Sequence, residues 1–256
     1  YYYSEVGVAK KLQRLMEAKA ETSNIEIVDV INEKSKITYD EVQIAAIREA
    51  VKSKVMVLTG GPGTGKTTTT LGIIAVLESM KLDILCAAPT GRAAKRMTQA
   101  TGEDAQTIHR MLEYYYDEAA DRMVFGRGAE NPLTAGCIII DEVSMVRCDV
   151  LDAVDRALRV MKHSVAPFGG LQMVFVGDLY QLEPVVTEFD RPILEENYGT
   201  GDYHFFSSWA MDSAPLPKIE LTKVYRQSDL GFVKLLDRIR TGRADEFDIE
   251  TLNRTS

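Results

Sequence analysis

The chain has 256 residues, a formal net charge of -8, 45% hydrophobic residues and 27% charged residues. This length and composition are typical of a globular protein with a full hydrophobic core, in one large domain or two small ones, and the net acidity argues against broad electrostatic adhesion to nucleic acid. No apolar run approaches the roughly 20 residues that cross a bilayer, and the N-terminus lacks the apolar segment of a signal peptide, so we expect a cytoplasmic protein, or a nuclear one in a eukaryote.

The first 37 residues are predicted to form an amphipathic helix at 4–20 followed by a polar linker. Because the chain begins with three tyrosines and no methionine, we interpret this part as the tail of a preceding domain. The main domain is predicted to run from 38 to 256, and its first helix begins where Thr38 or Asp40 can act as the N-cap.

Strand and helix patterns then alternate along the chain. Short apolar runs predict buried strands at 55–60, 83–90, 137–142 and 172–178. Helical periodicity predicts helices at 67–80, 91–102, 105–113 and 148–162. This alternation favours an α/β fold with a doubly wound parallel sheet, whose ligand site lies at the carboxyl ends of the strands.

Two further features concern the segment 113–133 and the cysteines. The segment contains two short aromatic or apolar pieces around a polar turn, which predicts a small β-ribbon inserted in the domain.

The three cysteines are widely spaced and odd in number. This favours buried thiols in a reducing compartment over a zinc site or a disulfide framework. The cysteines are Cys86, Cys137 and Cys148.

The stretch GGPGTGKTTTT, at 60–70, matches the phosphate-loop pattern G-x-x-x-x-G-K-[ST] of P-loop NTPases. In such a loop the backbone N–H groups wrap a phosphate chain, Lys66 reaches the terminal phosphates and the Thr67 hydroxyl binds Mg²⁺. The preceding strand and following helix make a simple glycine-rich turn the weaker interpretation. The residues expected to bind the nucleotide here are Gly61, Pro62, Gly63, Thr64, Gly65, Lys66, Thr67 and Thr68.

Carboxylates and a glutamine follow the two later strands. Asp141 ends a buried strand in IIIDEVSM, where it is expected to share Mg²⁺ with Thr67, and Glu142 is a candidate general base for the attacking water. Two solvated carboxylates at a strand end are the alternative. In FVGDLYQLEPV, Gln181 can contact the terminal phosphate or the water, and Asp178 can anchor the loop. Taken alone, this last motif is weak.

The ordered set of motifs resembles the RecD-like and Pif-like helicases of superfamily one. The set consists of GGPGTGKTTT, AAPTGRAAKRM (87–97), QTIHRML (106–112), IIIDEVSM, PFGGLQMVFVGDLYQLEPV (167–185) and ELTKVYRQSDLGFVKLLDRIRTGRADE (220–246). The resemblance spans roughly residues 38–250. It implies a RecA-like first motor domain with ATP and Mg²⁺ as ligands, single-stranded DNA as track, 5'-to-3' movement, and a ribbon at 113–133 that splits the duplex.

The resemblance also implies roles for single residues. Gln43 matches the glutamine that reads adenine, and Arg226 matches an arginine that contacts the terminal phosphate. The catalytic set then comprises Lys66, Glu142, Gln181 and Arg226. The residues expected at the DNA backbone are Pro89, Thr90, Gly91, Arg92, Thr107 and His109.

Several of these DNA contacts have structural alternatives. His109 can instead be a helix-packing histidine, and Arg92, Lys95 and Arg96 can form a solvated helix face. The tyrosines at 114–116 can stack on bases or simply fill the ribbon, and the second interpretation is preferred.

The implied function is that of an ATP-dependent DNA helicase motor. Glu183 stands where the family usually has proline, and the chain ends before anything similar to the second RecA-like domain, so we expect this chain alone to be inactive or weak. The alternatives are a P-loop ATPase module that binds DNA or a protein without unwinding, and a small-molecule kinase or GTP switch. No N-K-x-D guanine motif is present, which argues against the GTP switch.

Overall fold

A computed structural model describes residues 37–118, 121–199, 201–212, 217–225 and 230–255. The predicted helix at 4–20, its linker and the predicted phosphate contact Arg226 lie outside these ranges. In the part of the chain that is described, no helix combines the length and hydrophobicity needed to cross a membrane.

Helices and strands alternate through most of the domain. In chain order they are α3 (Glu41–Lys52), β1 (Val55–Gly60), α4 (Lys66–Ser79), β2 (Ile84–Ala88), α5 (Gly91–Thr101), β3 (Ala105–Thr107), α6 (Ile108–Met111), β4 (Tyr114–Asp117), β5 (Arg122–Phe125), β6 (Cys137–Ile140), η1 (Val143–Met145), α7 (Cys148–Met161), η2 (Pro167–Gly170), β7 (Gln172–Gly177), α8 (Asp190–Tyr198), η3 (Phe205–Ser207), β8 (Lys218–Leu221), α9 (Leu230–Arg240) and α10 (Glu246–Thr255).

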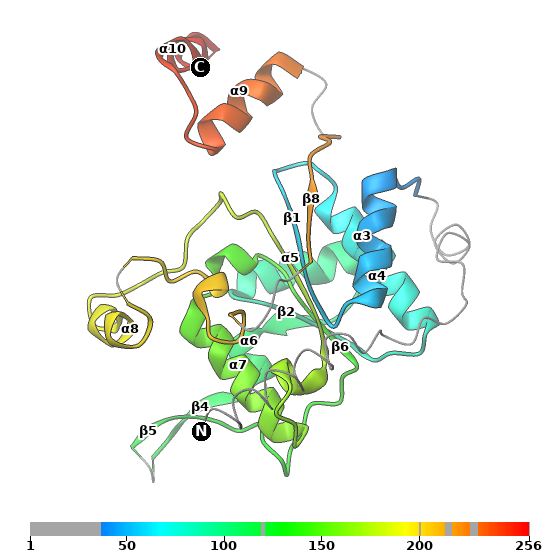
Figure 1. Cartoon of the computed structure of the whole chain (residues 1–256), viewed down its shortest axis with the longest axis vertical. Coiled ribbons are helices and arrows are strands. Elements are labelled where there is room, and N and C mark those ends of the chain that lie inside the picture. Colours follow the sequence, from blue (N-terminus) through cyan, green and yellow to red (C-terminus); the bar gives the residue numbers. More distant parts are fainter. Residues whose placement is uncertain (1–36, 119–120, 200, 213–216, 226–229, 256) are drawn as a thin grey trace, which may run out of the picture.

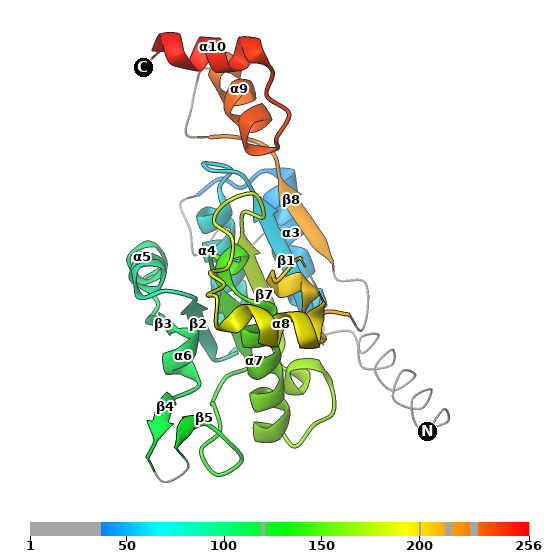
Figure 2. The same ribbon diagram turned by 90° about the vertical axis from the view of Figure 1, so that its left-hand side faces the viewer.

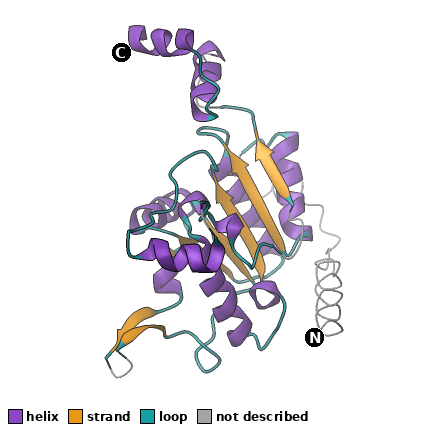
Figure 3. Cartoon of the chain, turned by 60° about the vertical axis from the view of Figure 1, so that its left-hand side comes forward, coloured by secondary structure: helices purple, strands orange, loops and turns teal. Residues whose placement is uncertain are grey.

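The main sheet has six strands in the order β3-β2-β6-β7-β1-β8, and every neighbouring pair is parallel (Figures 1 and 3). The predicted α/β fold with a parallel sheet is therefore confirmed. Because all the strands run the same way, their carboxyl ends meet at one edge. In this order β7 lies between β1 and β6, an arrangement that matters for the site below.

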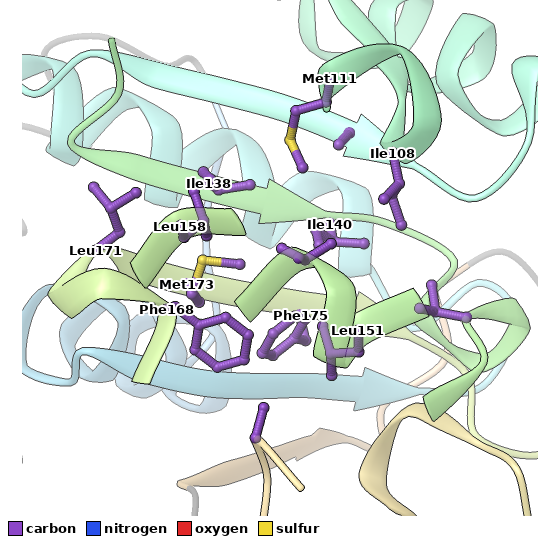
Figure 4. Packing of buried hydrophobic residues seen from close by; sticks show 14 of the residues in the cluster. Ile108, Met111, Ile138, Ile140, Leu151, Leu158, Phe168, Leu171, Met173 and Phe175 are labelled. Atoms are coloured by element: carbon purple, nitrogen blue, oxygen red, sulfur yellow. The ribbon is translucent and has the colours of Figure 1, made fainter. Parts of the chain in front are cut away.

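The core lies on both faces of this sheet. Alternate residues of each central strand belong to opposite clusters: Val57 packs on the face covered by α6 and α7, and Leu58 on the face covered by α3 and α4. Figure 4 shows the first cluster, in which Phe168 and Phe175 pack edge to face beside Leu151 and Leu158 of α7. This two-sided burial explains why the strands are continuous apolar runs rather than alternating ones.

The predicted β-ribbon is present as the antiparallel pair β4–β5, shorter than the segment 113–133. It projects at the opposite end of the molecule from α9 and α10 (Figure 2). Tyr114 packs on Phe125 with ring centroids 5.0 Å apart, whereas Tyr115 and Tyr116 are each 51% exposed. Tyr114 is itself 39% exposed, so it packs against Phe125 but remains accessible, as the other two tyrosines are.

The predicted helix at 105–113 is wrong in its first part. Residues Ala105–Thr107 form β3, which pairs in parallel with β2, and only Ile108–Met111 are helical. Ile108, Met111 and Leu112 have helical spacing and are buried, and this pattern masked the short strand. The edge of β2 supplies hydrogen-bond partners that no local pattern reveals. Strand β8 was likewise not predicted, because only Ile219 and Leu221 of its four residues are apolar and its pairing with β1 is what makes it a strand.

Candidate functional site

The loop between β1 and α4 requires glycine at position 65. Gly65 is the N-cap of α4 and has φ 86° and ψ 21°, in the left-handed region that glycine favours. A Cβ there would lie 2.5 Å from the side-chain nitrogen of Gln43. The Thr64 hydroxyl donates to the Gly61 carbonyl at 2.8 Å and closes the turn. Backbone strain and close approach together explain this part of the motif.

Lys66 points back into the loop. Its Nζ donates to the carbonyl oxygens of Gly60 at 2.6 Å and Gly61 at 3.1 Å. Burial lowers the pKa of Lys66, and the carboxylates of Asp178, Glu142 and Asp141 oppose this shift. These three acids follow β6 and β7, so they lie at the same edge of the sheet as the phosphate loop, and their charges act on Lys66 there.

The four threonines divide into two pairs. Thr69 and Thr70 are buried, and their hydroxyls donate to the carbonyls of Gly65 at 2.9 Å and Lys66 at 3.0 Å within the helix. Thr67 is exposed and Thr68 is half-buried, and both line the pocket described below. Only Thr67 and Thr68 are therefore placed for a ligand.

Asp141 and Glu142 follow β6 directly. One Asp141 oxygen accepts from the Glu142 backbone N–H at 2.8 Å, and Glu142 has φ 51° and ψ 42°. A non-glycine residue in this region costs roughly 1–3 kcal/mol, and such strain clusters at functional sites. Burial raises the pKa of Asp141, and the neighbouring Glu142 charge adds to this shift. A divalent cation would offset that penalty, and the donor set of Thr67 and Asp141 oxygens fits Mg²⁺.

A pocket of about 490 Å³ opens beside the loop and is lined by Gln43, Gly63–Thr68 and Tyr225. Gln43 is 3% exposed and forms a capping box with Asp40: the Asp40 N–H donates to the Gln43 side-chain oxygen at 3.0 Å, and the Gln43 N–H donates to the Asp40 carboxylate at 2.8 Å. The Gln43 amide nitrogen faces the Gly65 carbonyl at 3.5 Å. The side chain is therefore held at the pocket wall by its own helix.

Tyr225 is a pocket residue that the sequence did not predict. Its backbone N–H donates to the Gly63 carbonyl at 2.9 Å, and its hydroxyl donates to the Asp40 carboxylate. Tyr225 follows β8, so it joins the pocket only because β8 pairs with β1. The available clue was its place next to Arg226 in the quoted motif.

Gln43→Glu is expected to weaken ATP binding by roughly tenfold and to remove any preference for ATP over GTP. The substitution replaces the side-chain amide donor by a carboxylate oxygen, so an acceptor on the base would be left without a partner. Glutamate is accepted at this position of a capping box, so the melting temperature should hold. Competition of GTP against labelled ATP checks this. Unchanged selectivity would show that Gln43 does not read the base.

The loop after β7 carries Asp178, Gln181 and Glu183. Asp178 is 1% exposed, and one of its oxygens accepts from the Tyr180 N–H at 3.1 Å and from Nη1 of Arg240 at 2.8 Å. The Gln181 N–H donates to the Asp178 carbonyl at 3.0 Å, and its side chain is exposed. Glu183 is exposed, so the residue at the family's proline position faces solvent. Arg240 was not predicted as a site residue.

The predicted DNA contacts lie at the same edge, around the outer strands β2 and β3. Ala88 and Thr107 are paired across these strands. Thr90 is the N-cap of α5 and Thr107 the N-cap of α6, and their hydroxyls accept from Ala93 N–H at 3.2 Å and Arg110 N–H at 3.1 Å. Each hydroxyl keeps its own proton, which it can donate to a phosphate.

The other predicted DNA contacts are accessible. Gly91 and Arg92 are exposed at the start of α5, and Pro89 is half-buried. His109 is exposed and its ring lies 5.3 Å from that of Tyr114, so it is not a buried packing histidine. The structure thus separates the predicted residues into a phosphate-loop group at β1, β7 and β6 and a second group at β2 and β3.

Comparisons with known proteins agree with this geometry. A family model described as "AAA domain" matches residues 43–187. The chain is similar to the ATP-dependent RecD2 DNA helicase of Deinococcus radiodurans, with 33% identity over 198 residues, which are 77% of this chain and 23% of the relative. It is also similar to the human ATP-dependent DNA helicase PIF1, with 30% identity over 217 residues, which are 80% of this chain and 30% of the relative.

Solved structures of Pif1 share the fold. A crystal structure of Bacteroides Pif1 bound to ssDNA has a TM-score of 0.71 and 31% identity, over 86% of this chain and 50% of that one. A structure of Bacteroides sp Pif1 in complex with ADP-AlF4 has a TM-score of 0.69 and 31% identity, over 84% and 49%. The chain spans about half of these structures and less than a third of the two curated relatives.

Proposed function

The chain belongs to the AAA-domain family, among the Pif1-like and RecD2-like DNA helicases of superfamily 1, and on this premise we propose that it is the ATP-hydrolysing half of a DNA helicase motor. The observation that carries the proposal is one of position: the phosphate loop with Lys66, the Asp141–Glu142 pair after β6 and Asp178 after β7 all lie at the carboxyl ends of one parallel sheet, at the edge that also presents the second group of residues. Structural relatives include Pif1 proteins bound to ssDNA and to ADP-AlF4.

The proposed roles follow from chemistry and position. The backbone N–H groups of the phosphate loop and the Lys66 ammonium bind the phosphates, and the Gln43 and Tyr225 pocket receives the base. Mg²⁺, held by Thr67 and Asp141, would neutralise charge on the transferred phosphate. Glu142 accepts the proton of the attacking water. Gln181 and Arg226 are proposed to sense the terminal phosphate.

Movement on DNA requires a second site that responds to the first. Residues Pro89–Arg92, Thr107 and His109 are proposed to contact the backbone of single-stranded DNA, because hydroxyls, N–H groups and arginine bind phosphates without reading sequence. ATP turnover is then proposed to close a second RecA-like domain onto this one and to move the strand 5'-to-3'. Because DNA is the proposed partner, we propose that the protein acts where DNA is present, in the cytoplasm or, in a eukaryote, in the nucleus.

ATP turnover by the complete enzyme is expected to rise with single-stranded DNA by roughly tenfold or more, the size of a typical coupling between two sites. The measurement is the steady-state ATPase rate with and without an oligonucleotide, at fixed Mg²⁺. Thr107→Val keeps the shape and removes the hydroxyl, which also caps α6 through the Arg110 N–H, so the melting temperature is measured beside the rates. The variant should reduce the stimulation and leave the DNA-free rate unchanged.

A rate that is indifferent to DNA in the complete enzyme would contradict the helicase motor. DNA-stimulated turnover without strand separation would instead identify a DNA-dependent ATPase module. A strand-displacement assay with 5' and 3' overhangs, run beside the ATPase assay, separates these outcomes and tests the polarity.

A further inference from the structure

Helix α9 ends on the phosphate loop, although it lies about 180 residues later in the chain and beyond the body of the sheet (Figure 1). Its last residue, Arg240, donates from Nη1 to the buried carboxylate of Asp178 at 2.8 Å, and its guanidinium carbon lies 5.0 Å from the centroid of the Tyr180 ring. A Cβ on Gly61 would meet that carbon at 3.4 Å. The guanidinium therefore packs directly against the loop that holds Lys66.

Asp178 stands between two cations. It follows β7, the strand between β1 and β6, so it lies between the phosphate loop and Asp141. The Asp178 carboxylate pairs with Arg240 at 2.8 Å, the Arg240 guanidinium packs on Gly61, and the Lys66 ammonium donates to the Gly61 carbonyl at 3.1 Å. Lys66 and the Asp178–Arg240 ion pair thus border the same residue of the loop, and the Asp178 charge also opposes the effect of burial on Lys66.

Among the described ion pairs, Arg240 is the cation that contacts the Asp178 carboxylate, and it also pairs with the more exposed Asp237 at 2.8 Å. Asp178 is 1% exposed, and its oxygen Oδ2 is buried with no donor among the described residues. A buried charge that loses its partner is strongly unfavourable, because neither water nor another cation replaces the lost interaction. Without Arg240, Asp178 would draw on the cation that it already influences, which is Lys66.

We propose that Arg240 is a positioning residue of the nucleotide site, which neutralises Asp178 and so keeps the Lys66 ammonium available to the phosphates of the bound nucleotide. The proposal rests on the proposed function, since it takes a nucleoside triphosphate as the ligand of the loop. It makes α9 part of the nucleotide site through an ion pair, without contact between Arg240 and the substrate.

The test compares affinities for Mg·ATP and Mg·ADP by calorimetric titration of the purified protein. Arg240→Gln keeps much of the side-chain volume. It is expected to weaken the binding of both nucleotides by roughly tenfold, or about 1.4 kcal/mol, because the phosphate-loop lysine reaches the outer phosphates. At saturating ATP the bound phosphates hold Lys66, so turnover should change less than affinity does. Adding Asp178→Asn should restore the affinity, since the carboxylate that captures Lys66 is gone.

A matched control lies on the same helix. Arg238 pairs with Asp248, which is 2% exposed, and this ion pair is the counterpart of Arg240 with Asp178. Arg238→Gln removes the ion-pair partner of a buried carboxylate away from the loop and leaves Asp248 with the Asp245 backbone N–H as donor. This variant is therefore expected to lower the melting temperature without weakening the binding of ATP.

Three results would overturn the inference. The first is an unchanged ATP affinity in Arg240→Gln. The second is a loss of ATP affinity that Asp178→Asn does not rescue, since this would indicate that Arg240 only holds α9 in place. A loss confined to ATP, with ADP unaffected, would instead show direct contact with the terminal phosphate.

Asp178→Asn alone keeps the inference testable if Arg240→Gln does not fold. It removes the competing carboxylate, so ATP affinity should be equal to that of the unsubstituted protein or higher, and a weaker affinity would contradict the inference. If the unsubstituted protein does not bind Mg·ATP, the proposed function fails. If it binds and the variants have no effect, only the role of Arg240 fails.

Discussion

Lys66→Ala is expected to lower ATP turnover by roughly 10²–10³-fold, the loss typical of removing one preorganised group that stabilises charge in a transition state. The reason is electrostatic: the charges of Asp141, Glu142 and Asp178 act on the Lys66 ammonium, and the alanine variant leaves the phosphates beside these carboxylates without that cation. Nucleotide binding should weaken as well, since repulsion replaces attraction.

The fold should survive this substitution. Lys66 is the first residue of α4, its Nζ donates only to the carbonyls of Gly60 and Gly61 among the described contacts, and alanine is the best helix former. The measurements are the steady-state ATPase rate of the complete enzyme and the melting temperature. Lys52→Ala, at the exposed end of α3, is the control and should leave both unchanged. Normal turnover in Lys66→Ala would refute the assignment of the phosphate loop.

Glu142→Gln is expected to keep ATP binding and lose turnover by roughly 10²–10⁴-fold, the contribution typical of a positioned general base. Glutamine has nearly the same shape but does not accept the proton of the attacking water. The Glu142 charge contributes to the raised pKa of Asp141, so its removal should make Asp141 ionise more readily and should not impair Mg²⁺ binding.

Binding and turnover must be measured separately for this variant. Equilibrium titration with Mg·ATP should give an affinity close to that of the unsubstituted protein, and single-turnover kinetics should show the slow chemical step. Glu183→Gln is the control, because Glu183 is an exposed carboxylate in the loop after β7. A Glu142→Gln variant with normal turnover would mean that another group activates the water.

The local motifs predicted the elements that carry them. Gly65 and Lys66 lie at a strand-to-helix turn as the phosphate-loop pattern requires, and the apolar runs before Asp141 and Asp178 are buried strands. These predictions depend on contacts within a few residues, where periodicity and glycine conformation decide the structure. The pattern failed at Ala105–Thr107, because the partner of that strand is 19 residues away in the chain and leaves no local trace.

Several site contacts depend on strand order, which no local pattern contains. Tyr225 enters the pocket because β8 pairs with β1, and Arg240, the last residue of α9, reaches the phosphate loop where it pairs with Asp178 after β7. Asp178 separates Lys66 from Asp141 because β7 is inserted between their strands. These residues are close in space and far apart in sequence, so only the packed sheet brings them together.

The amino-acid sequence by itself determined that the protein has a phosphate loop, a parallel α/β fold, an aspartate and a glutamate directly after a buried strand, and a resemblance to one helicase family. All of these follow from short-range spacing, which the chain carries without reference to its partners. Only the tertiary structure decided which charges face each other across the loop. Electrostatic interactions act through space, so the ion pair of Arg240 with Asp178, and its influence on Lys66, exist only once the strands are ordered and the helices have packed.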